Sequence, residues 1–289
     1  MNKFAVDSKR ALIGSALFVW ALLIAGCGDD AVNISQYLPQ ADVDKPSLSA
    51  PAATQPNALM APASAKRFKV KRVIDGDTIT LKNGDKVRFV GINTPELGHG
   101  KFRDEPLANV AKRFVQNKLK GKSVLLETGN ERKDRHGRVL AHVYTESGES
   151  IQSQLLEKGL AFAVAVGKNL RYIDQYTQAE QRARAAKKGV WGDDFYAPIN
   201  VAQANQKNSR GYRRIQGKVE RVSQSKNNQI LHLKGDFRVL IKRELWKKYF
   251  KGKASRYKGK TITVRGWIFK SHGVQGLKIY HPTMLEVNS

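Results

Sequence analysis

The chain has 289 residues, 41% of them hydrophobic, which is enough for two folded domains and excludes a disordered polypeptide. Its 51 Lys and Arg outnumber its 25 Asp and Glu, so the formal net charge is +26, far more than solubility requires. Such an excess indicates a polyanionic partner, either nucleic acid or an acidic membrane surface.

Residues 1–26 have the pattern of a bacterial lipoprotein signal peptide. A basic start precedes an apolar run over residues 11–25, which is shorter than the ~20 residues that a membrane-spanning helix needs. Ile24–Cys27 resembles the cleavage box in which the signal is cut before a cysteine that then receives lipid. We therefore expect a cell-envelope protein anchored through lipidated Cys27 and facing the periplasm or the exterior, with Gly28 favouring the outer membrane. The alternative is an uncleaved N-terminal anchor with an incidental thiol.

Residues 27–65 comprise this cysteine and a flexible linker rich in Ala, Pro, Ser, Asp and Gln. At Lys66 the pattern changes to an alternation of apolar and polar residues, interrupted at residues 75–76 and 83–85 by Asp-Gly and Asn-Gly-Asp. This pattern predicts three antiparallel strands between Lys66 and Asn93.

The remainder of the first domain, predicted to cover residues 66–196, mixes helices and strands. One-sided apolar spacing predicts helices over 105–119, 151–158 and 173–186, the first with Pro106 near its start. Two further strands are expected near 124–127 and 139–144, separated by a charged loop. The fold class is therefore mainly β with some α.

Residues 207–289 form a second predicted domain, in which 21 basic residues accompany only 4 acidic ones. Three strands, a short helix over 244–250 and two further strands fit a small five-stranded barrel of the oligonucleotide-binding (OB) type. We expect this domain to bind nucleic acid and to raise substrate affinity in a salt-dependent way. Anionic lipid headgroups are the alternative partner, and a barrel without a ligand remains a third possibility.

Three clusters in the first domain carry residues suited to phosphodiester chemistry. Asp75 and Asp77 flank a glycine and offer oxygen ligands to a hard cation. Arg88 and Glu96 stand at the two ends of "RFVGINTPE", and Arg138 ends "RKDRHGR". Cleaving a phosphodiester requires stabilisation of negative charge on the phosphate oxygens and activation of a water, which guanidinium groups and a carboxylate provide.

The stretches "VIDGDT", "VRFVGINTPE", "RKDRHGRVLAHVY", "EKGLA" and "GVW" together resemble the staphylococcal nuclease, or thermonuclease, family from about Lys66 to Asp194. The resemblance implies an OB-type five-stranded barrel packed against three helices. It also implies calcium-dependent hydrolysis of DNA and RNA to products that end in 3′-phosphate. A chain of this family that kept the fold but lost most activity would instead be a nucleic-acid-binding envelope lipoprotein.

By this resemblance, Asp77 is the main calcium carboxylate, Asp75 supports it, and Thr94 offers its backbone carbonyl to the metal. Asn93 stands where the best-known member has a second calcium-binding aspartate, so weaker calcium affinity is expected.

The same resemblance makes Arg88 and Arg138 the two phosphate clamps and Glu96 the residue that orients or deprotonates the attacking water. Ala165 and Gly167 replace aromatic residues that line the family's nucleotide pocket, which puts base stacking there in doubt. His136 and His142 suggest zinc as an alternative metal, but the sequence offers no third nearby His or Cys to complete a ligand set.

Overall fold

The computed structural model describes residues 58–98, 100, 102–206, 211–271 and 273–288. The predicted signal peptide, Cys27 and most of the expected linker lie outside these residues. Within the described part, no helix combines the length and the hydrophobicity needed to cross a membrane.

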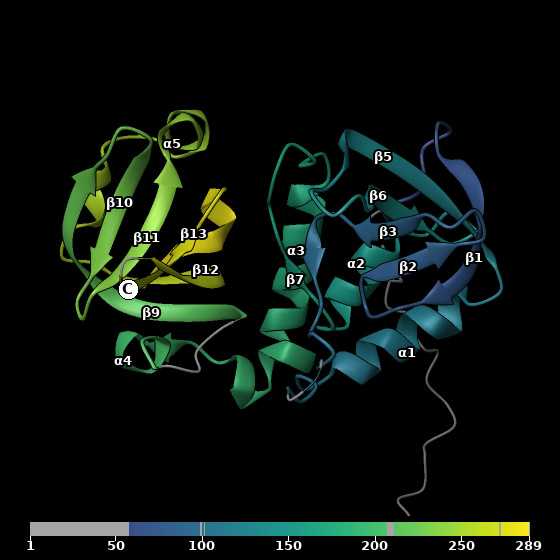
Figure 1. Cartoon of the computed structure of the whole chain (residues 1–289), viewed down its shortest axis with the longest axis horizontal. Coiled ribbons are helices and arrows are strands. Elements are labelled where there is room, and N and C mark those ends of the chain that lie inside the picture. Colours follow the sequence, from purple (N-terminus) through teal and green to yellow (C-terminus); the bar gives the residue numbers. More distant parts are fainter. Residues whose placement is uncertain (1–57, 99, 101, 207–210, 272, 289) are drawn as a thin grey trace, which may run out of the picture. The chain divides into compact units, whose positions relative to one another are not determined.

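The first half of the described chain forms a closed five-stranded barrel with strand order β1-β2-β3-β6-β5 (Figure 1). Its strands are β1 (Lys66–Val73), β2 (Thr78–Leu81), β3 (Lys86–Phe89), β5 (Ser123–Lys133) and β6 (Val139–Tyr144). Three helices accompany it, α1 (Ala108–Leu119), α2 (Ile151–Glu157) and α3 (Ile173–Ala185). A short strand pair, β4 (Ile92–Asn93) with β7 (Phe162–Ala163), connects the end of β3 to the helical layer. This architecture confirms the expected OB-type barrel with three helices.

The core of this barrel follows from the alternation seen in the sequence. Ile79, Val87 and Phe89 lie on inward-facing positions of neighbouring strands and are almost completely buried. Helix α1 adds Ala111 and Val115 from one face to the same cluster.

Two element boundaries differ from the expectation. Helix α1 begins at Ala108 rather than at 105, because Leu107 adopts a left-handed conformation with φ of 66° and so cannot continue a helix backward to Pro106. Strand β5 extends to Lys133, so half of the expected charged loop belongs to a strand. A register shift separates Thr128 from Lys133 along the pairing with β6, and Arg132 and Lys133 at this end of the strand are exposed.

The second half forms another five-stranded barrel, which the pairing of β12 with β9 closes. Its strands follow in the order β9 (Tyr212–Gln224), β10 (Asn228–Leu233), β11 (Phe237–Lys242), β13 (Val274–Lys278) and β12 (Thr261–Ser271). Helix α5 (Arg243–Tyr249) lies between β11 and β12, and β11 runs parallel to β13. Further elements are β8 (Ile199–Asn200), α4 (Val201–Ala204), β14 (Leu285–Val287) and the 3-10 turns Gly189–Trp191, Asp194–Tyr196, Ala254–Tyr257 and Pro282–Met284. The predicted OB-like second barrel is confirmed.

The second core takes residues from before the barrel's first strand. Val201 and Ala204 belong to it, and a capping box at Asn200 starts the short helix that carries them. Most aromatic residues of this part also serve the core, among them Phe237 and Trp246. Trp267 is an exception, with 38% of its surface exposed.

Among the residues that the structure describes, three ion pairs join the two barrels, and one of them is buried. Arg265 of β12 donates to Glu180 of α3 at 2.7 Å, and only 4% of the arginine side chain and 6% of the glutamate side chain are exposed. Arg184 meets Glu286 through two hydrogen bonds of 2.8 Å, and Arg213 meets Glu105 at 3.3 Å.

Candidate active site

Asp77 occupies the turn between β1 and β2, where surrounding donors fix its carboxylate. Oδ2 accepts hydrogen bonds from the backbone N–H of Thr94 at 3.0 Å and from its hydroxyl at 3.1 Å. Oδ1 accepts from the hydroxyl of Thr78 at 3.1 Å. Because the residue is 5% exposed, a buried carboxylate is held here in one orientation.

Arg88, at the end of β3, packs against this carboxylate. Nη1 lies 3.1 Å from Oδ2 of Asp77 and donates to the carbonyls of Phe89 at 2.7 Å and Ile92 at 3.1 Å. Nη2 donates to Oδ1 of Asn93 at 3.2 Å. The planar guanidinium is therefore fixed by contacts on several sides, which preorganises its remaining donors.

Asn93 and Thr94 are linked in a way that the sequence did not indicate. The amide of Asn93 accepts from Arg88 with its oxygen and donates from Nδ2 to the carbonyl of Thr94 at 3.2 Å. The amide thus contacts both a predicted phosphate clamp and the carbonyl expected to face the metal. An aspartate could accept from Arg88 in the same way but could not donate to that carbonyl.

Burial and neighbouring charge raise the pKa values of two carboxyl groups at this site. Loss of solvent and the nearby Asp77 carboxylate raise the pKa of Asp75 from 3.8 to about 6. The same two causes raise the pKa of Glu96 from 4.5 to about 7, although Glu96 keeps part of its surface open to solvent. Carboxylate oxygens are donors that hard cations take in proteins, and a divalent charge beside them would relieve repulsion of this kind.

Among the described residues, no group of three or more His, Cys, Asp and Glu side chains is arranged to hold a metal ion. His142 of β6 is buried against α3, where its Nδ1 lies 2.8 Å from the hydroxyl of Tyr176. His136 is exposed and pairs with Arg135. The structure therefore places the two histidines in different environments.

Glu105 is a neighbour of Glu96 that the sequence analysis missed. The backbone N–H of Glu96 donates to Oε2 of Glu105 at 3.0 Å, and the backbone N–H of Glu105 donates to the carbonyl of Glu96 at 2.9 Å. Glu105 also accepts from Arg213 of the second barrel. The position of Glu96 thus depends on a residue nine positions later and, through it, on β9.

Arg138 reaches the site through strand pairing. Strands β3 and β6 run parallel with Arg88 opposite Leu140, so Arg138, two residues before Leu140, projects to the same side as Arg88. Asp134 holds its Nε at 2.7 Å and accepts from its backbone N–H at 3.0 Å. Burial opposes the charge of this aspartate, but the hydrogen bonds from Arg138 hold its pKa below the usual value.

Arg88 and Arg138 line one cavity of about 380 Å³. Its wall also includes Val164, Val166 and Gly167, while Ala165 is buried behind it. No aromatic side chain other than that of Phe89 contributes to this lining among the described residues. The cavity therefore offers cations for a phosphate and small apolar contacts for the rest of a ligand.

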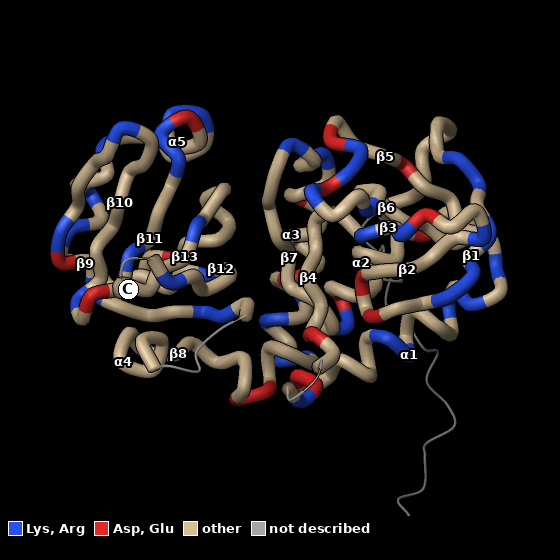
Figure 2. Tube along the Cα trace, viewed as in Figure 1, with Lys and Arg blue, Asp and Glu red and all other residues tan. Residues whose placement is uncertain are grey.

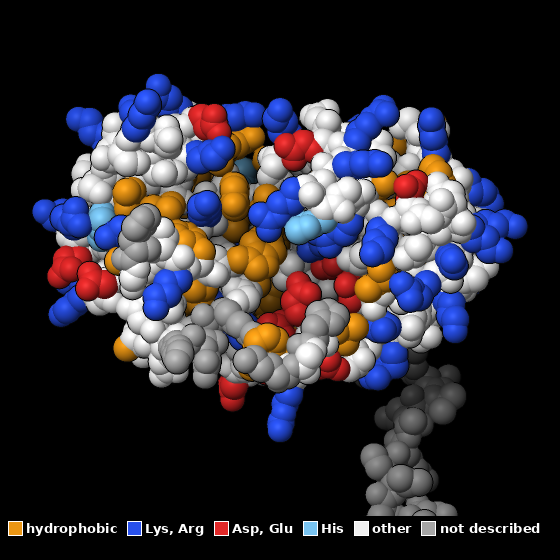
Figure 3. Space-filling view, in the orientation of Figure 1, with side chains coloured by type: hydrophobic (Ala, Val, Ile, Leu, Met, Phe, Trp, Pro, Cys, Tyr) orange, Lys and Arg blue, Asp and Glu red, His pale blue; other side chains and the backbone are white. Residues whose placement is uncertain are grey.

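Charge is distributed unevenly around this site. Figure 2 shows basic positions along the strands of both barrels, and Figure 3 shows a group of acidic side chains near the centre of one face, with Lys and Arg over much of the remaining surface. A phosphate approaching the first barrel meets two fixed guanidiniums beside a carboxylate cluster. Such an arrangement can hold a phosphodiester and direct a water at it.

A family model described as "Staphylococcal nuclease homologue" matches residues 86–193 of this chain, a range that includes Arg88, Glu96 and Arg138. Thermonuclease of Staphylococcus hyicus is 34% identical over 134 residues, covering 45% of this chain and 79% of that protein. Endonuclease YncB of Bacillus subtilis is 32% identical over 200 residues, covering 65% of this chain and 94% of that protein. The SPbeta prophage-derived endonuclease YokF of the same organism is 33% identical over 202 residues, covering 65% of this chain and 68% of that protein.

Proposed function

The chain belongs to the staphylococcal nuclease family and is a phosphodiester-hydrolysing endonuclease, and from that premise we propose a calcium-dependent reaction on DNA or RNA that leaves 3′-phosphate ends. The observation that carries the proposal is the convergence of Arg88 and Arg138 on one cavity beside the Asp75, Asp77 and Glu96 carboxylates.

Arg88 and Arg138 bind the phosphate in this proposal. Arg88 lies on β3 and Arg138 immediately before β6. Each is held by a carboxylate, Asp77 and Asp134 respectively, so their free N–H groups need little reorganisation when the phosphate arrives. Preorganised donors favour the transition state because negative charge grows on the non-bridging oxygens during attack. The fork of each guanidinium can give two parallel hydrogen bonds to these oxygens.

Glu96 orients the attacking water and accepts its proton. Its raised pKa, about 7, lies near neutral pH, where a general base combines a sufficient ionised fraction with adequate basicity. Glu105 fixes the backbone that carries it. Asp77 and Asp75, with the carbonyl of Thr94 and the amide of Asn93, would hold calcium, which supplies charge stabilisation to the phosphate.

Location at the cell envelope is part of the same proposal. It depends on the lipoprotein pattern ending at Cys27, from which residues 28–65 would tether the catalytic barrel to the membrane, and such anchoring requires more than one acyl chain to be stable. A Cys27→Ser variant should lose lipid labelling and cleavage before residue 27. Retention of either in that variant contradicts the lipoprotein assignment.

The reaction is tested with the purified protein and labelled single-stranded DNA or RNA, with calcium or with a chelator. We expect cleavage only with calcium, and products whose terminal phosphate sits on the 3′ oxygen by mass spectrometry. Arg88→Ala should lower kcat by about 10²–10³, whereas Arg72→Ala, an exposed arginine on β1, should leave it unchanged.

The alternative function is nucleic-acid binding with little or no catalysis. Binding of labelled strands without cleavage by the wild type would favour it. Undiminished cleavage by Arg88→Ala would show that the site described above does not perform the reaction.

A further inference from the structure

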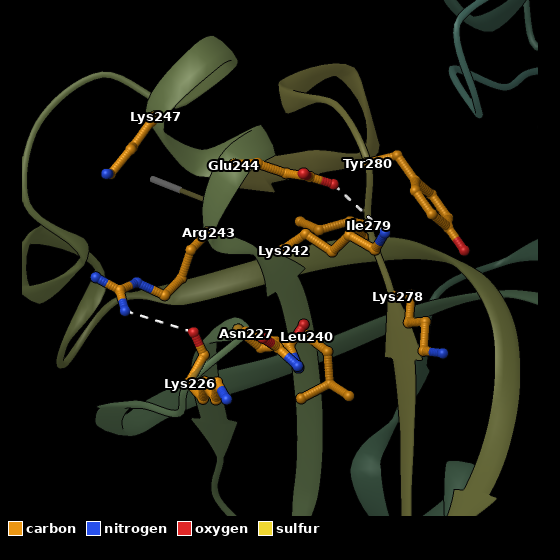
Figure 4. A pocket seen from close by; sticks show the side chains of 11 residues that line it. Lys226, Asn227, Leu240, Lys242, Arg243, Glu244, Lys247, Lys278, Ile279 and Tyr280 are labelled. Carbon is orange, nitrogen blue, oxygen red and sulfur yellow. Dashed lines mark hydrogen bonds and ion pairs between the residues drawn. The ribbon is translucent and has the colours of Figure 1, made fainter.

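A basic groove opens at one end of the second barrel. It has a volume of about 850 Å³ and is formed by the β9–β10 turn, the end of β11, the start of α5 and the end of β13. Figure 4 shows Arg243 and Lys247 on one side, Lys278 and Tyr280 on the opposite side, and Leu240 between them. The groove is separate from the catalytic cavity, and the two share no lining residue within the described ranges.

The cations of this groove are mostly unneutralised. In the described part of the chain, five Lys and Arg side chains line it against a single acidic one, Glu244, which lies 3.4 Å from Lys242. Among the described residues, no carboxylate forms an ion pair with Lys226, Lys247 or Lys278. Like charges gathered without partners repel one another, so the groove gains stability from a bound polyanion.

The shape of the groove favours a strand over two other anionic ligands. Pockets for small molecules are lined mainly by apolar and aromatic side chains, whereas this lining is dominated by cations and amides. A lipid surface is broad and flat, so it cannot reach cations that face one another across a concave groove. A flexible phosphate backbone can enter it and contact both walls.

The floor and rim supply the remaining contacts. Leu240 and the buried Ile279 form an apolar floor, Asn227 lies beside Leu240, and Tyr280 lies at the edge. An aromatic ring beside a track of cations is the combination that binds unpaired bases together with their phosphates. A paired base in a duplex does not expose its face to such a ring.

We infer that this groove is a second binding site for single-stranded nucleic acid, which holds the polymer through its phosphates while the first barrel cuts it. The binding step stands on the groove alone, and the benefit to cleavage rests on the proposed nuclease function. The groove supplies affinity along the strand without base-specific contacts. Its loss should therefore weaken processing of long strands and spare very short ones.

The test compares two triple variants of the full chain that remove equal charge. One is Lys226→Ala, Lys247→Ala and Lys278→Ala in the groove. The other is Lys234→Ala, Lys258→Ala and Lys260→Ala, exposed lysines at the opposite end of the same barrel, where Lys234 pairs with Lys218 and Gly259 with Val219. Binding of labelled oligothymidylate is measured by fluorescence anisotropy in a chelator, which prevents cleavage.

The groove variant should bind the strand about tenfold or more weakly, and the slope of log Kd against log salt should fall by about 2, since each lost phosphate contact removes about 0.7 for single strands. The control variant should keep most of the affinity for the strand and most of the salt dependence. Cleavage of a trinucleotide, too short to occupy both sites, should be the same in all three proteins, which also shows that the variants are folded.

Equal weakening in both variants would overturn the inference, because it would mean that general charge and not the groove binds the strand. Unchanged binding by the groove variant would overturn it as well. The inference would also be overturned if the groove variant no longer bound vesicles of phosphatidylcholine and phosphatidylserine but still bound oligothymidylate. That result would assign the groove to lipid. Failure of the wild type to cut any strand contradicts the proposed function and leaves the binding result standing.

Discussion

The two barrels have the same strand order but use their charged residues differently. In the first barrel, Arg88 and Arg138 line one cavity and each contacts a carboxylate, Asp77 and Asp134 respectively. In the second barrel, the groove cations largely lack such partners in the described structure. The interiors differ as well, because most of the buried polar side chains, including Asp77, Asn93 and His142, belong to the first half of the chain.

This difference separates two kinds of recognition on one scaffold. Paired guanidiniums are fixed, so they suit a phosphate that must sit at one position relative to a base and a metal. Unpaired lysines on long side chains suit a polymer that can slide, because many positions along the strand satisfy them equally. The first arrangement costs stability through buried charge, and the second leaves the core almost entirely apolar.

The largest effect should come from the buried ion pair that joins the barrels. Arg265→Met leaves the Glu180 carboxylate buried without its partner, so the free energy of unfolding should fall by about 3–5 kcal/mol, measured by chemical denaturation. Glu180 would still accept a hydrogen bond from the backbone N–H of Ala163 at 2.7 Å, but this one bond does not compensate for the loss of the arginine's charge. This variant asks whether the two barrels form one stability unit.

The exposed pair at the same junction provides the control. Arg184→Ala, which removes the partner of Glu286, should cost about 1 kcal/mol or less because solvent screens that pair. Adding Glu180→Gln to Arg265→Met should recover much of the loss, since the amide oxygen can still accept from Ala163. Equal costs for Arg265→Met and Arg184→Ala would mean that the barrels are stabilised independently.

The fold was largely predictable because apolar and polar residues alternate along strands that have one buried face, and this alternation can be seen in the sequence. The stretch from Lys66 to Asn93 and the pattern after Tyr212 therefore led to two barrels. The continuation of β5 to Lys133 was missed since residues 128–133 include no buried position that would reveal the alternation. The start of α1 was misplaced because the left-handed Leu107 has no signal in the sequence.

The candidate site was predictable only in part. Asp77, Arg88 and Glu96 are close in sequence, and the resemblance to a known family singled them out together. Asp134 could have been found from its position four residues before Arg138. Arg213 could not, since its contact with Glu105 spans 108 residues and depends on how β9 passes the first barrel.

The next largest effect concerns the polar core of the first barrel. Burial lowers the pKa of His142 from 6.5 to about 4, with Glu127 opposing and Arg171 adding to the shift. The unfolded chain therefore binds a proton between pH 6.5 and 4 that the folded protein does not. The free energy of unfolding should therefore have its full value above pH 6.5 and fall by about 3 kcal/mol as the pH decreases to 4.

His142→Gln provides the comparison, because an amide can still hydrogen-bond to the hydroxyl of Tyr176 but does not titrate. Its free energy of unfolding should change less over the same pH range. Asp75 and Glu96, with raised pKa values, act in the opposite sense in both proteins and cancel in the difference. Parallel pH curves for the two proteins would show that His142 is not the group responsible.

A smaller effect is expected on catalysis in the first barrel from a substitution in the second. Arg213→Ala removes the 3.3 Å contact with Glu105, whose carboxylate holds the backbone of Glu96, so kcat on a trinucleotide should fall by about tenfold or less with KM unchanged. Arg221→Ala, an exposed arginine on the same strand, is the control. Unchanged kcat in Arg213→Ala would mean that the second barrel contributes binding alone.

The smallest expected effect concerns Asn93, which links the phosphate clamp to the predicted metal ligands. Asn93→Asp adds a charge beside Asp77 and removes the donor that occupies the carbonyl of Thr94, so calcium affinity should increase. The new carboxylate would also pair with Arg88, which offsets part of the gain. We expect the calcium concentration for half-maximal cleavage to fall roughly threefold to tenfold. Asn117→Asp on the exposed face of α1 should leave it unchanged, and an unchanged or higher requirement in Asn93→Asp would place the calcium elsewhere.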